Sequence, residues 1–364
     1  MLIKQNQIVI NGTTLEQSDL EAVANVSSDI QAQLDTKAST SDVQNVITKS
    51  ASAPSNPING DFWYDTSNYA FRFYDGTEWQ LIKQSFSATG GTITDNDGYR
   101  YHTFTSSGAF QVTKGSTDVE YVIIAGGGGG AMSNGGAGAG AGGVLTGTLN
   151  VSTANYSIIV GSGGSRTSDR DTPGNNGSNS SALGLTAIGG GGAGSESNGA
   201  DKSVRNGRSG GSGGGGVRNQ DGFGNGGSGT SGQGNNGGAN ANDGSPHYRG
   251  GGGGGAGSAG TNGGASGGGD GGQGILLSDW ATATGTGDNG YYASGGAGAS
   301  YDGEGAGGSA GTRYPGGAGL SGSTRTTSEM HGLPNTGGGG GAKGNFNEGG
   351  GNGGSGIVII RYPI

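Results

Sequence analysis

The stretch Glu120-Tyr-Val-Ile-Ile-Ala-Gly-Gly-Gly-Gly-Gly130 leads a β-forming segment straight into five glycines, and it decides how the chain must fold. A second segment of the same kind, Gly356-Ile-Val-Ile-Ile-Arg-Tyr362, lies near the other end of the sequence. Apolar, β-branched residues favour strands, and they need a partner that buries them. We therefore expect the two segments to pair as neighbouring strands that frame everything between them.

Between these segments, dense glycine runs alternate with short polar insertions tipped by aromatic residues. Glycine makes up 93 of the 364 residues, and pure runs fill 126–130, 189–192, 213–216, 250–255 and 337–341. Glycine loses more conformational freedom on folding than any other residue, so such runs are typical of disorder. Here two pairing strands enclose the glycine runs, which favours an ordered structure for them. We expect polyproline-II-type rods, with about 3.1 Å rise per residue, that pack side by side and hydrogen-bond through their backbones.

The composition points away from one large conventional domain. Only 29% of the residues are hydrophobic and 12% are charged, whereas ordinary globular domains are nearer half apolar. Several small modules fit better.

Cysteine is absent, which excludes disulfides and thiolate metal sites. The net charge of −9 argues against nucleic acid as a partner. The N-terminus lacks a secretion signal, and no apolar stretch is long enough to span a bilayer, so we expect assembly in a cytoplasm.

The N-terminal part divides into an attachment segment, 1–14, and a helical segment, 15–50. An apolar stripe at helical spacing runs through the second segment and consists of Leu20, Val23, Ile30 and Leu34. This stripe predicts an amphipathic helix. A short parallel coiled coil that forms a homotrimer is our preferred interpretation. The alternative is a single surface helix packed on its own domain.

Residues 51–84 form the next unit, a small aromatic β module with a strong hairpin turn at Asp75-Gly76. Trp63 and Trp79 could stack on sugar rings if they were exposed. We favour the simpler interpretation, in which such aromatic residues are the core of a minimal domain.

The last unit is a glycine-rich distal domain, 85–364. Short β-type segments at 91–94, 99–104, 108–113, 143–151 and 156–160 supply enough strands for a small β-sandwich base. The expected fold is thus mainly β with polyglycine-II helices. It combines a short N-terminal coiled-coil helix, a small β-hairpin module, and a C-terminal β-sandwich base that bears a glycine-rich bundle.

Because a glycine lattice has no side chains, chemistry must lie in the insertions between rods. Tyrosine, arginine and histidine are typical of contact surfaces. The receptor-contact candidates are His247, Tyr248, Arg249, Tyr291, Tyr292, Tyr314 and His331. We expect them at the end of the bundle away from Ile357–Tyr362. The alternative is that such residues pack on the flanks of the lattice or between protomers.

Catalysis has little support in the sequence. There are three histidines, and none stands in a metal-binding His-Glu-x-x-His motif. No lysine follows a glycine, so a phosphate-binding loop is absent. A pair of carboxylates that cleaves glycans stays open. We expect no catalytic residues, no metal and no cofactor.

Three motifs together resemble bacteriophage tail fibres. Three segments resemble the glycine-rich domain of these fibres, over about residues 86–364: Val122-Ile-Ile-Ala-Gly-Gly-Gly-Gly-Gly130, Tyr156-Ser-Ile-Ile-Val-Gly-Ser-Gly-Gly164 and Gly-Ser-Gly-Ile-Val-Ile-Ile-Arg-Tyr362. Gly60-Asp-Phe-Trp-Tyr-Asp65 with Tyr74-Asp-Gly-Thr-Glu-Trp79 resembles a small module of phage tail and neck proteins. Leu34-Asp-Thr-Lys-Ala-Ser-Thr-Ser-Asp-Val43 is similar to short helical segments in fibre shafts.

The resemblance implies a fibre of the virion tail that is assembled in the host cytoplasm. Its N-terminus would attach to a phage tail or baseplate protein. Its loops would recognise a host surface glycan or outer-membrane protein. Two other function classes stay open: a purely structural fibre or connector, and a glycan-depolymerising fibre.

Overall fold

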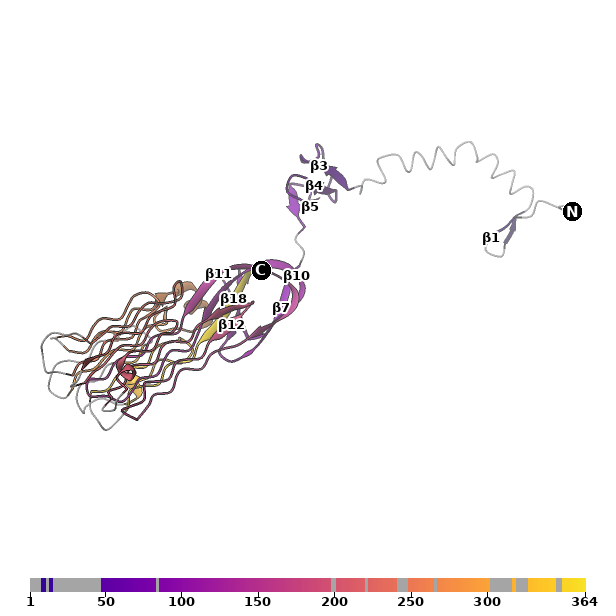
Figure 1. The fold of residues 1–364 in the computed structure, drawn as a ribbon. Coiled ribbons are helices and arrows are strands. Elements are labelled where there is room, and N and C mark those ends of the chain that lie inside the picture. Colours follow the sequence, from indigo (N-terminus) through magenta and orange to yellow (C-terminus); the bar gives the residue numbers. More distant parts are fainter. Residues whose placement is uncertain are drawn as a thin grey trace. The chain divides into compact units, whose positions relative to one another are not determined.

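The computed structural model describes residues 8–10, 13–15, 47–82, 85–197, 201–219, 222–240, 248–264, 267–301, 316–318, 327–344 and 349–364. The chain divides into two compact units, Met1–Gln84 and Ser85–Ile364, and Figure 1 shows both.

The described residues of the first unit form two small sheets. In one, β1 (Ile8–Ile10) pairs antiparallel with β2 (Thr13–Leu15). The other has the order β3-β4-β5-β6. Its strands are β3 (Thr48–Ser50), β4 (Phe62–Asp65), β5 (Ala70–Tyr74) and β6 (Trp79–Leu81). Strand β3 runs parallel to β4, and the other pairs are antiparallel.

Trp63 is a core residue of this four-stranded sheet. Its side chain is buried, and its indole N–H donates to the backbone oxygen of Ser50 at 3.1 Å. The ring of Trp79 meets it edge-on at 5.6 Å, and the guanidinium of Arg72 lies 5.6 Å from its centre. The sheet therefore uses Trp63 for packing, as the simpler interpretation of the sequence expects.

The expected fold class is wrong in its N-terminal coiled coil. Among the described residues the one α-helix is α3 (Ser278–Thr284), which lies in the second unit. The described ends of the segment expected to be helical are extended instead: Leu15 belongs to β2, and β3 occupies 48–50. Pairing with β4 and the bond from Trp63 hold β3 in a sheet. The stripe residues Leu20, Val23, Ile30 and Leu34 lie outside the described residues.

A six-stranded sheet organises the second unit, in the order β11-β10-β18-β9-β8, with β7 also paired to β10. Its strands are β7 (Ser87–Thr89), β8 (Thr92–Asn96), β9 (Tyr99–Phe104), β10 (Gly108–Ile124), β11 (Val144–Ile158) and β18 (Ile357–Pro363). Strands β10 and β18 pair antiparallel, with Ile124 opposite Ile357. The expected pairing of the two apolar segments that frame the glycine-rich region is confirmed.

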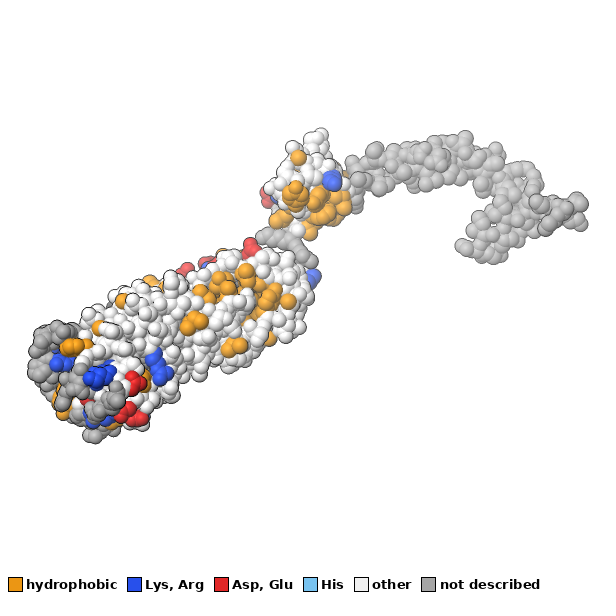
Figure 2. All heavy atoms as spheres, in the orientation of Figure 1, with side chains coloured by type: hydrophobic (Ala, Val, Ile, Leu, Met, Phe, Trp, Pro, Cys, Tyr) orange, Lys and Arg blue, Asp and Glu red, His pale blue; other side chains and the backbone are white. Residues whose placement is uncertain are grey.

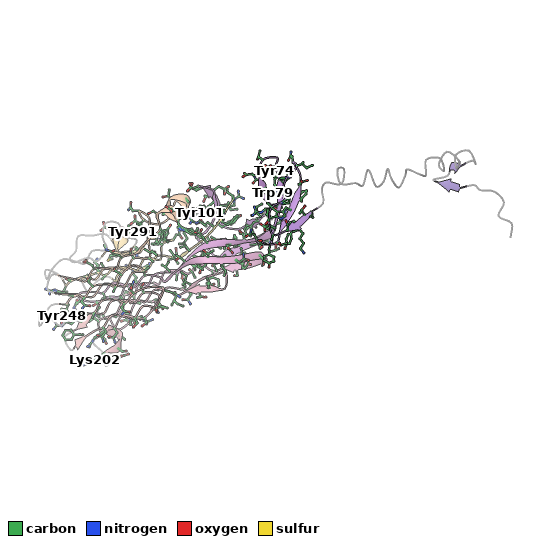
Figure 3. The ribbon with its side chains drawn as sticks, turned by 90° about the horizontal axis from the view of Figure 1, so that it is seen from above. Tyr74, Trp79, Tyr101, Lys202, Tyr248 and Tyr291 are labelled. Atoms are coloured by element: carbon green, nitrogen blue, oxygen red, sulfur yellow. The ribbon has the colours of Figure 1, made fainter. Side chains whose placement is uncertain are left out.

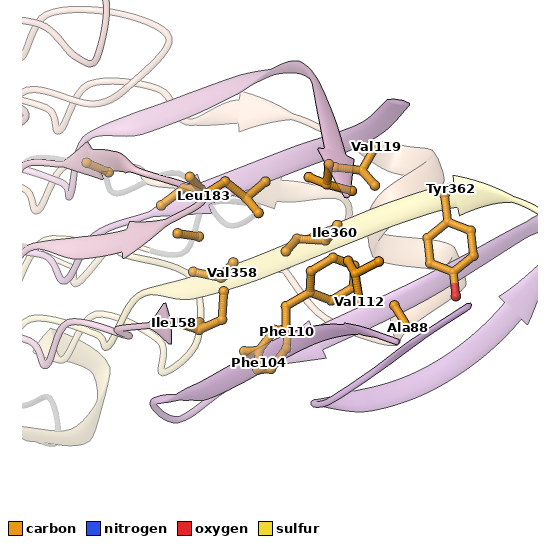
Figure 4. Packing of buried hydrophobic residues seen from close by; sticks show 14 of the residues in the cluster. Ala88, Phe104, Phe110, Val112, Val119, Ile158, Leu183, Val358, Ile360 and Tyr362 are labelled. Carbon is orange, nitrogen blue, oxygen red and sulfur yellow. The ribbon is translucent and has the colours of Figure 1, made fainter. Parts of the chain in front are cut away.

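Both faces of this sheet are buried where the end of β10 pairs with β18, which explains why Val122–Ile124 and Ile357–Ile360 are apolar without interruption. One face packs Val119, Ile123, Val358 and Ile360 against the hairpin of β12 and β13, as Figure 4 shows in part. The other face packs Val122, Ile124, Ile357 and Ile359 against α3, β16 and β17. The bounds are β12 (Ser180–Ala182), β13 (Leu185–Ala187), β16 (Ile275–Leu276) and β17 (Tyr291–Tyr292).

The expected β-sandwich is wrong as well. The segments predicted as separate strands at 143–151 and 156–160 form a single strand, β11. The predicted segment at 108–113 and the apolar segment that begins at Glu120 together form the 17-residue β10, because the chain bulges between Val112 and Ser116 instead of turning. Merged strands leave too few for a second large sheet. Short hairpins and α3 cover the sheet in its place.

The glycine runs pack through their backbones, and we call this packed region the glycine lattice. Along Gly126–Gly130, the first and fourth amides donate to the segment 175–178, the second and fifth to 351–354, and the third to Gly140, at 2.8–3.1 Å. The partners therefore rotate with a period of three residues. Each glycine amide in this run finds an acceptor on a neighbouring segment, so backbone groups buried without a regular sheet are satisfied.

Close packing leaves no room for a Cβ atom at particular glycines inside the lattice. A Cβ atom on Gly252 would overlap the backbone oxygen of Asp270, and one on Gly339 would overlap that of Ala139. The lattice therefore requires glycine at these positions because neighbouring backbones touch, whatever the local φ angle.

Candidate binding surface

The segments of the lattice run outward from the sheet and return, so the chain turns at the far end. The hydrogen-bond partners of Gly126–Gly130 run antiparallel to it in both 175–178 and 351–354. We call the described parts of 131–135, 166–173, 195–206, 217–223 and 248–249 the distal turns. Figure 3 places Lys202 and Tyr248, which belong to two of these turns, at the end of the unit away from the sheet.

Glu196 joins three distal turns through one carboxylate. Its side chain is 5% exposed, and its Oε2 accepts from Arg170 Nη2 at 3.2 Å and from the backbone N–H of Asn134 at 3.0 Å. The neighbouring Ser195 hydroxyl donates to the backbone oxygen of Met132 at 3.1 Å. Because a buried carboxylate needs its partners, these contacts fix the three turns relative to one another.

Arg205 links a fourth distal turn, 217–223, to the turn 195–206. It closes the 3₁₀ helix η1 (Ser203–Arg205), is 2% exposed, and donates from Nη2 to the backbone oxygen of Ser197 at 3.4 Å. Its own backbone oxygen accepts from the N–H of Val217 at 3.0 Å. The next turn is the hairpin of β14 (Arg218–Asn219) and β15 (Gly222–Phe223). The buried side chains of Glu196 and Arg205 therefore hold these distal turns in place.

Charges of both signs face solvent on the distal turns. Asp169, Asp201 and Lys202 are exposed, and the guanidinium of Arg218 lies 5.1 Å from the centre of the exposed Phe223 ring. A hydrogen bond from the Thr172 hydroxyl lowers the pKa of Asp169, and one from the Ser203 hydroxyl lowers the pKa of Asp201. Both carboxylates therefore stay ionised into the acidic range. Figure 2 shows acidic and basic side chains gathered at this end.

Two of the seven receptor-contact candidates lie in the distal turns. Tyr248 is half-buried, and its ring lies 6.2 Å from that of Tyr301 at an angle of 71°. Arg249 is buried, and its backbone oxygen accepts from the side-chain amide of Asn240. His247 and Tyr314 lie outside the described residues.

Three other candidates are not part of the distal turns. Tyr292 is fully buried against the sheet, its hydroxyl lies 2.7 Å from that of Thr286, and burial raises its pKa. It offers no surface to a partner. Tyr291 precedes it in β17 and is half-buried. His331 follows the 3₁₀ helix η2 (Thr327–Met330) and accepts the backbone N–H of Asn352 on Nδ1 at 2.8 Å; burial lowers its pKa.

None of the seven candidates predicted from the sequence falls in the distal turn 166–173. Its signal is visible in the sequence: after a long uncharged stretch, the residues Arg166-Thr-Ser-Asp-Arg-Asp171 carry four charges in six positions. Glu196 was missed too, because nothing in its local sequence distinguishes a buried carboxylate that bridges turns from a solvated one.

In the described part of the chain, no group of three or more His, Cys, Asp or Glu residues could hold a metal ion. No described helix has the length and apolar character needed to cross a membrane.

A sheet that anchors a glycine lattice with charged turns defines a glycine-rich β scaffold. The model of the glycine-rich domain family matches residues 104–363, and the chain belongs to that family. A comparison with curated proteins finds no match.

Proposed function

We propose that this protein is a receptor-binding fibre of a phage tail, whose distal turns contact a host surface glycan or an outer-membrane protein. The observation that carries the proposal is the separation of roles within the second unit. Backbone contacts build the lattice, whereas solvent-exposed charges and the Phe223 ring lie on turns at its far end.

Such a division suits a binding protein. Lattice contacts do not depend on the identity of the exposed turn residues, so these residues can change without loss of the scaffold. Buried groups such as Glu196 and Arg205 hold the turns in place before a partner arrives. A surface that is ordered in advance loses less conformational entropy on binding.

Attachment and assembly belong to the same proposal. The N-terminal unit would connect to a phage tail or baseplate protein, and the fibre would be assembled in the host cytoplasm and carried on the virion tail. Its support is the resemblance of the 60–79 motif to modules of phage tail and neck proteins.

The test is binding of the fluorescently labelled full chain to a panel of bacterial strains. The double variant Lys202→Ala with Phe223→Ala changes two exposed residues of the distal turns. It should melt like the wild type and bind the responsive strains at least tenfold more weakly. The matched control, Leu276→Ala, changes an exposed residue beside the sheet and should bind normally. Equal binding by both variants, or binding by the wild type to no strain, would contradict the proposal.

A further inference from the structure

Strand β11 forms an open edge of the six-stranded sheet. It pairs with β10 alone in the described part of the chain. At its start, the N–H of Val144 donates to the backbone oxygen of Gln233 at 3.0 Å. Further along, the N–H and C=O of Ser152 both bond to the Tyr156 hydroxyl at 3.1 Å. Backbone groups alternate in direction along an antiparallel strand, so the even-numbered residues from 144 to 152 direct theirs away from β10.

The middle of this edge is uncovered. Thr146, Thr148 and Asn150 lie between the two covered positions, and all three are exposed. Within the described residues, no hydrogen bond reaches the outward N–H and C=O groups of these three. A row of unpaired backbone groups is a ready template for another strand.

The sequence of the edge carries none of the usual protection against pairing. Open edges are normally blunted by lysine, proline or a bulge. From Tyr121 to Ser165 the chain has no charged residue and no proline. The bulge in this pair of strands falls in β10, between Val112 and Ser116, and leaves β11 continuous. A long, neutral and continuous edge is therefore suited to accept a strand.

We propose that β11 pairs with β11 of a second copy, antiparallel and across a two-fold axis at Thr148. The axis sets Thr148 opposite itself and Thr146 opposite Asn150, which forms about six backbone hydrogen bonds. Threonine pairs are favourable neighbours across strands. Leu149 is 37% exposed, and Gly147 of the second copy would lie opposite it and leave room for its side chain.

The neutral charge of the β11 edge favours a second copy of this chain, and not an unrelated charged peptide, as the strand that pairs with it. A two-fold axis sets each residue near its own duplicate, so a charged edge would repel itself. The β11 edge is neutral. The carboxylate beside it, Asp118 on β10, accepts from the Asn150 side-chain amide at 2.8 Å and stays one strand away from the axis.

The experiment compares the full-length wild type with Thr148→Lys, and uses Thr92→Lys as the control. Thr92 is an exposed threonine on β8, the opposite edge of the sheet. Sedimentation velocity over a range of concentrations measures association. Thr148→Lys should raise the midpoint concentration for dimer formation at least tenfold, whereas Thr92→Lys should match the wild type. Association of Thr148→Lys at the wild-type midpoint would overturn the proposal.

Hydrogen exchange of the wild type gives a second readout that needs no variant to fold. The amides of Thr146, Thr148 and Asn150 should become protected as the concentration rises, because pairing covers them. If they exchange at the rate of an unstructured peptide while the protein is associated, another surface joins the copies and the β11 edge is not the interface. This outcome is independent of binding to cells.

Discussion

At the scale of single residues, the lattice depends on the absence of Cβ atoms. A Cβ on Gly252 would overlap the backbone oxygen of Asp270, whereas one on Gly264 would have no atom within 4 Å. Gly252→Ala should lower the free energy of unfolding by about 2 kcal/mol, as overpacking of a tight interior does. Gly264→Ala should leave it unchanged or raise it slightly. Urea denaturation of both variants measures the difference, and equal stabilities would show that Gly252 is not packed against a neighbour.

His102 gives the sheet a dependence on pH. It is fully buried in β9, with Nδ1 2.7 Å from the backbone oxygen of Gly90, and burial lowers its pKa. Above the ordinary value of about 6.5 the ring is neutral in both states. Below it the unfolded chain takes up the proton first. Stability is therefore lost as pH falls from about 6.5 through the lower pKa of the folded state.

The check is the melting temperature between pH 7.5 and 4.5. His102→Gln, which keeps a hydrogen-bonding side chain but does not titrate, should flatten the fall relative to the wild type. His331, whose pKa burial also lowers, should leave a residual slope in both proteins. Identical pH profiles for the two proteins would show that His102 does not titrate differently on folding.

At the scale of elements, Arg361 shows how the second face of the sheet is closed. It projects from β18, donates to Glu120 at 2.7 Å and to the Tyr101 hydroxyl at 3.0 Å, and lies 4.4 Å from the centre of the Trp280 ring. Trp280 belongs to α3. A cation between aromatic rings, paired with a carboxylate, thus helps to hold the helix on the sheet.

Elements that depend on local pattern could be predicted, and those that depend on distant partners could not. The apolar runs at 120–125 and 356–362 predict their own pairing because their burial needs each other. The continuity of β10 and β11 could not be foreseen, because Ser116 and Ser152 look like turn residues until the opposite strand is known. The helical stripe at 15–50 follows a period that is compatible with a helix, yet the described part of that segment at 48–50 is held in a sheet by Trp63.

The candidate binding residues could also be predicted only in part. Tyr248 and Arg249 are on the distal turns because a polar insertion between glycine runs must turn at one end or the other. The sequence does not tell which end. Tyr292 looks like the other aromatic insertions, but its insertion turns at the sheet, where the apolar face buries it.

At the scale of the whole molecule, the central claim is that the glycine runs form one ordered lattice that carries the distal turns. Native-state hydrogen exchange of the glycine amides in 126–130 and 250–255 tests it most directly, because these amides donate to neighbouring segments throughout the lattice. The claim predicts that they exchange as slowly as the amides of β10 and β18, and that both sets are released together in global unfolding. Exchange of these glycines at the rate of an unstructured peptide, while β10 and β18 stay protected, would contradict it.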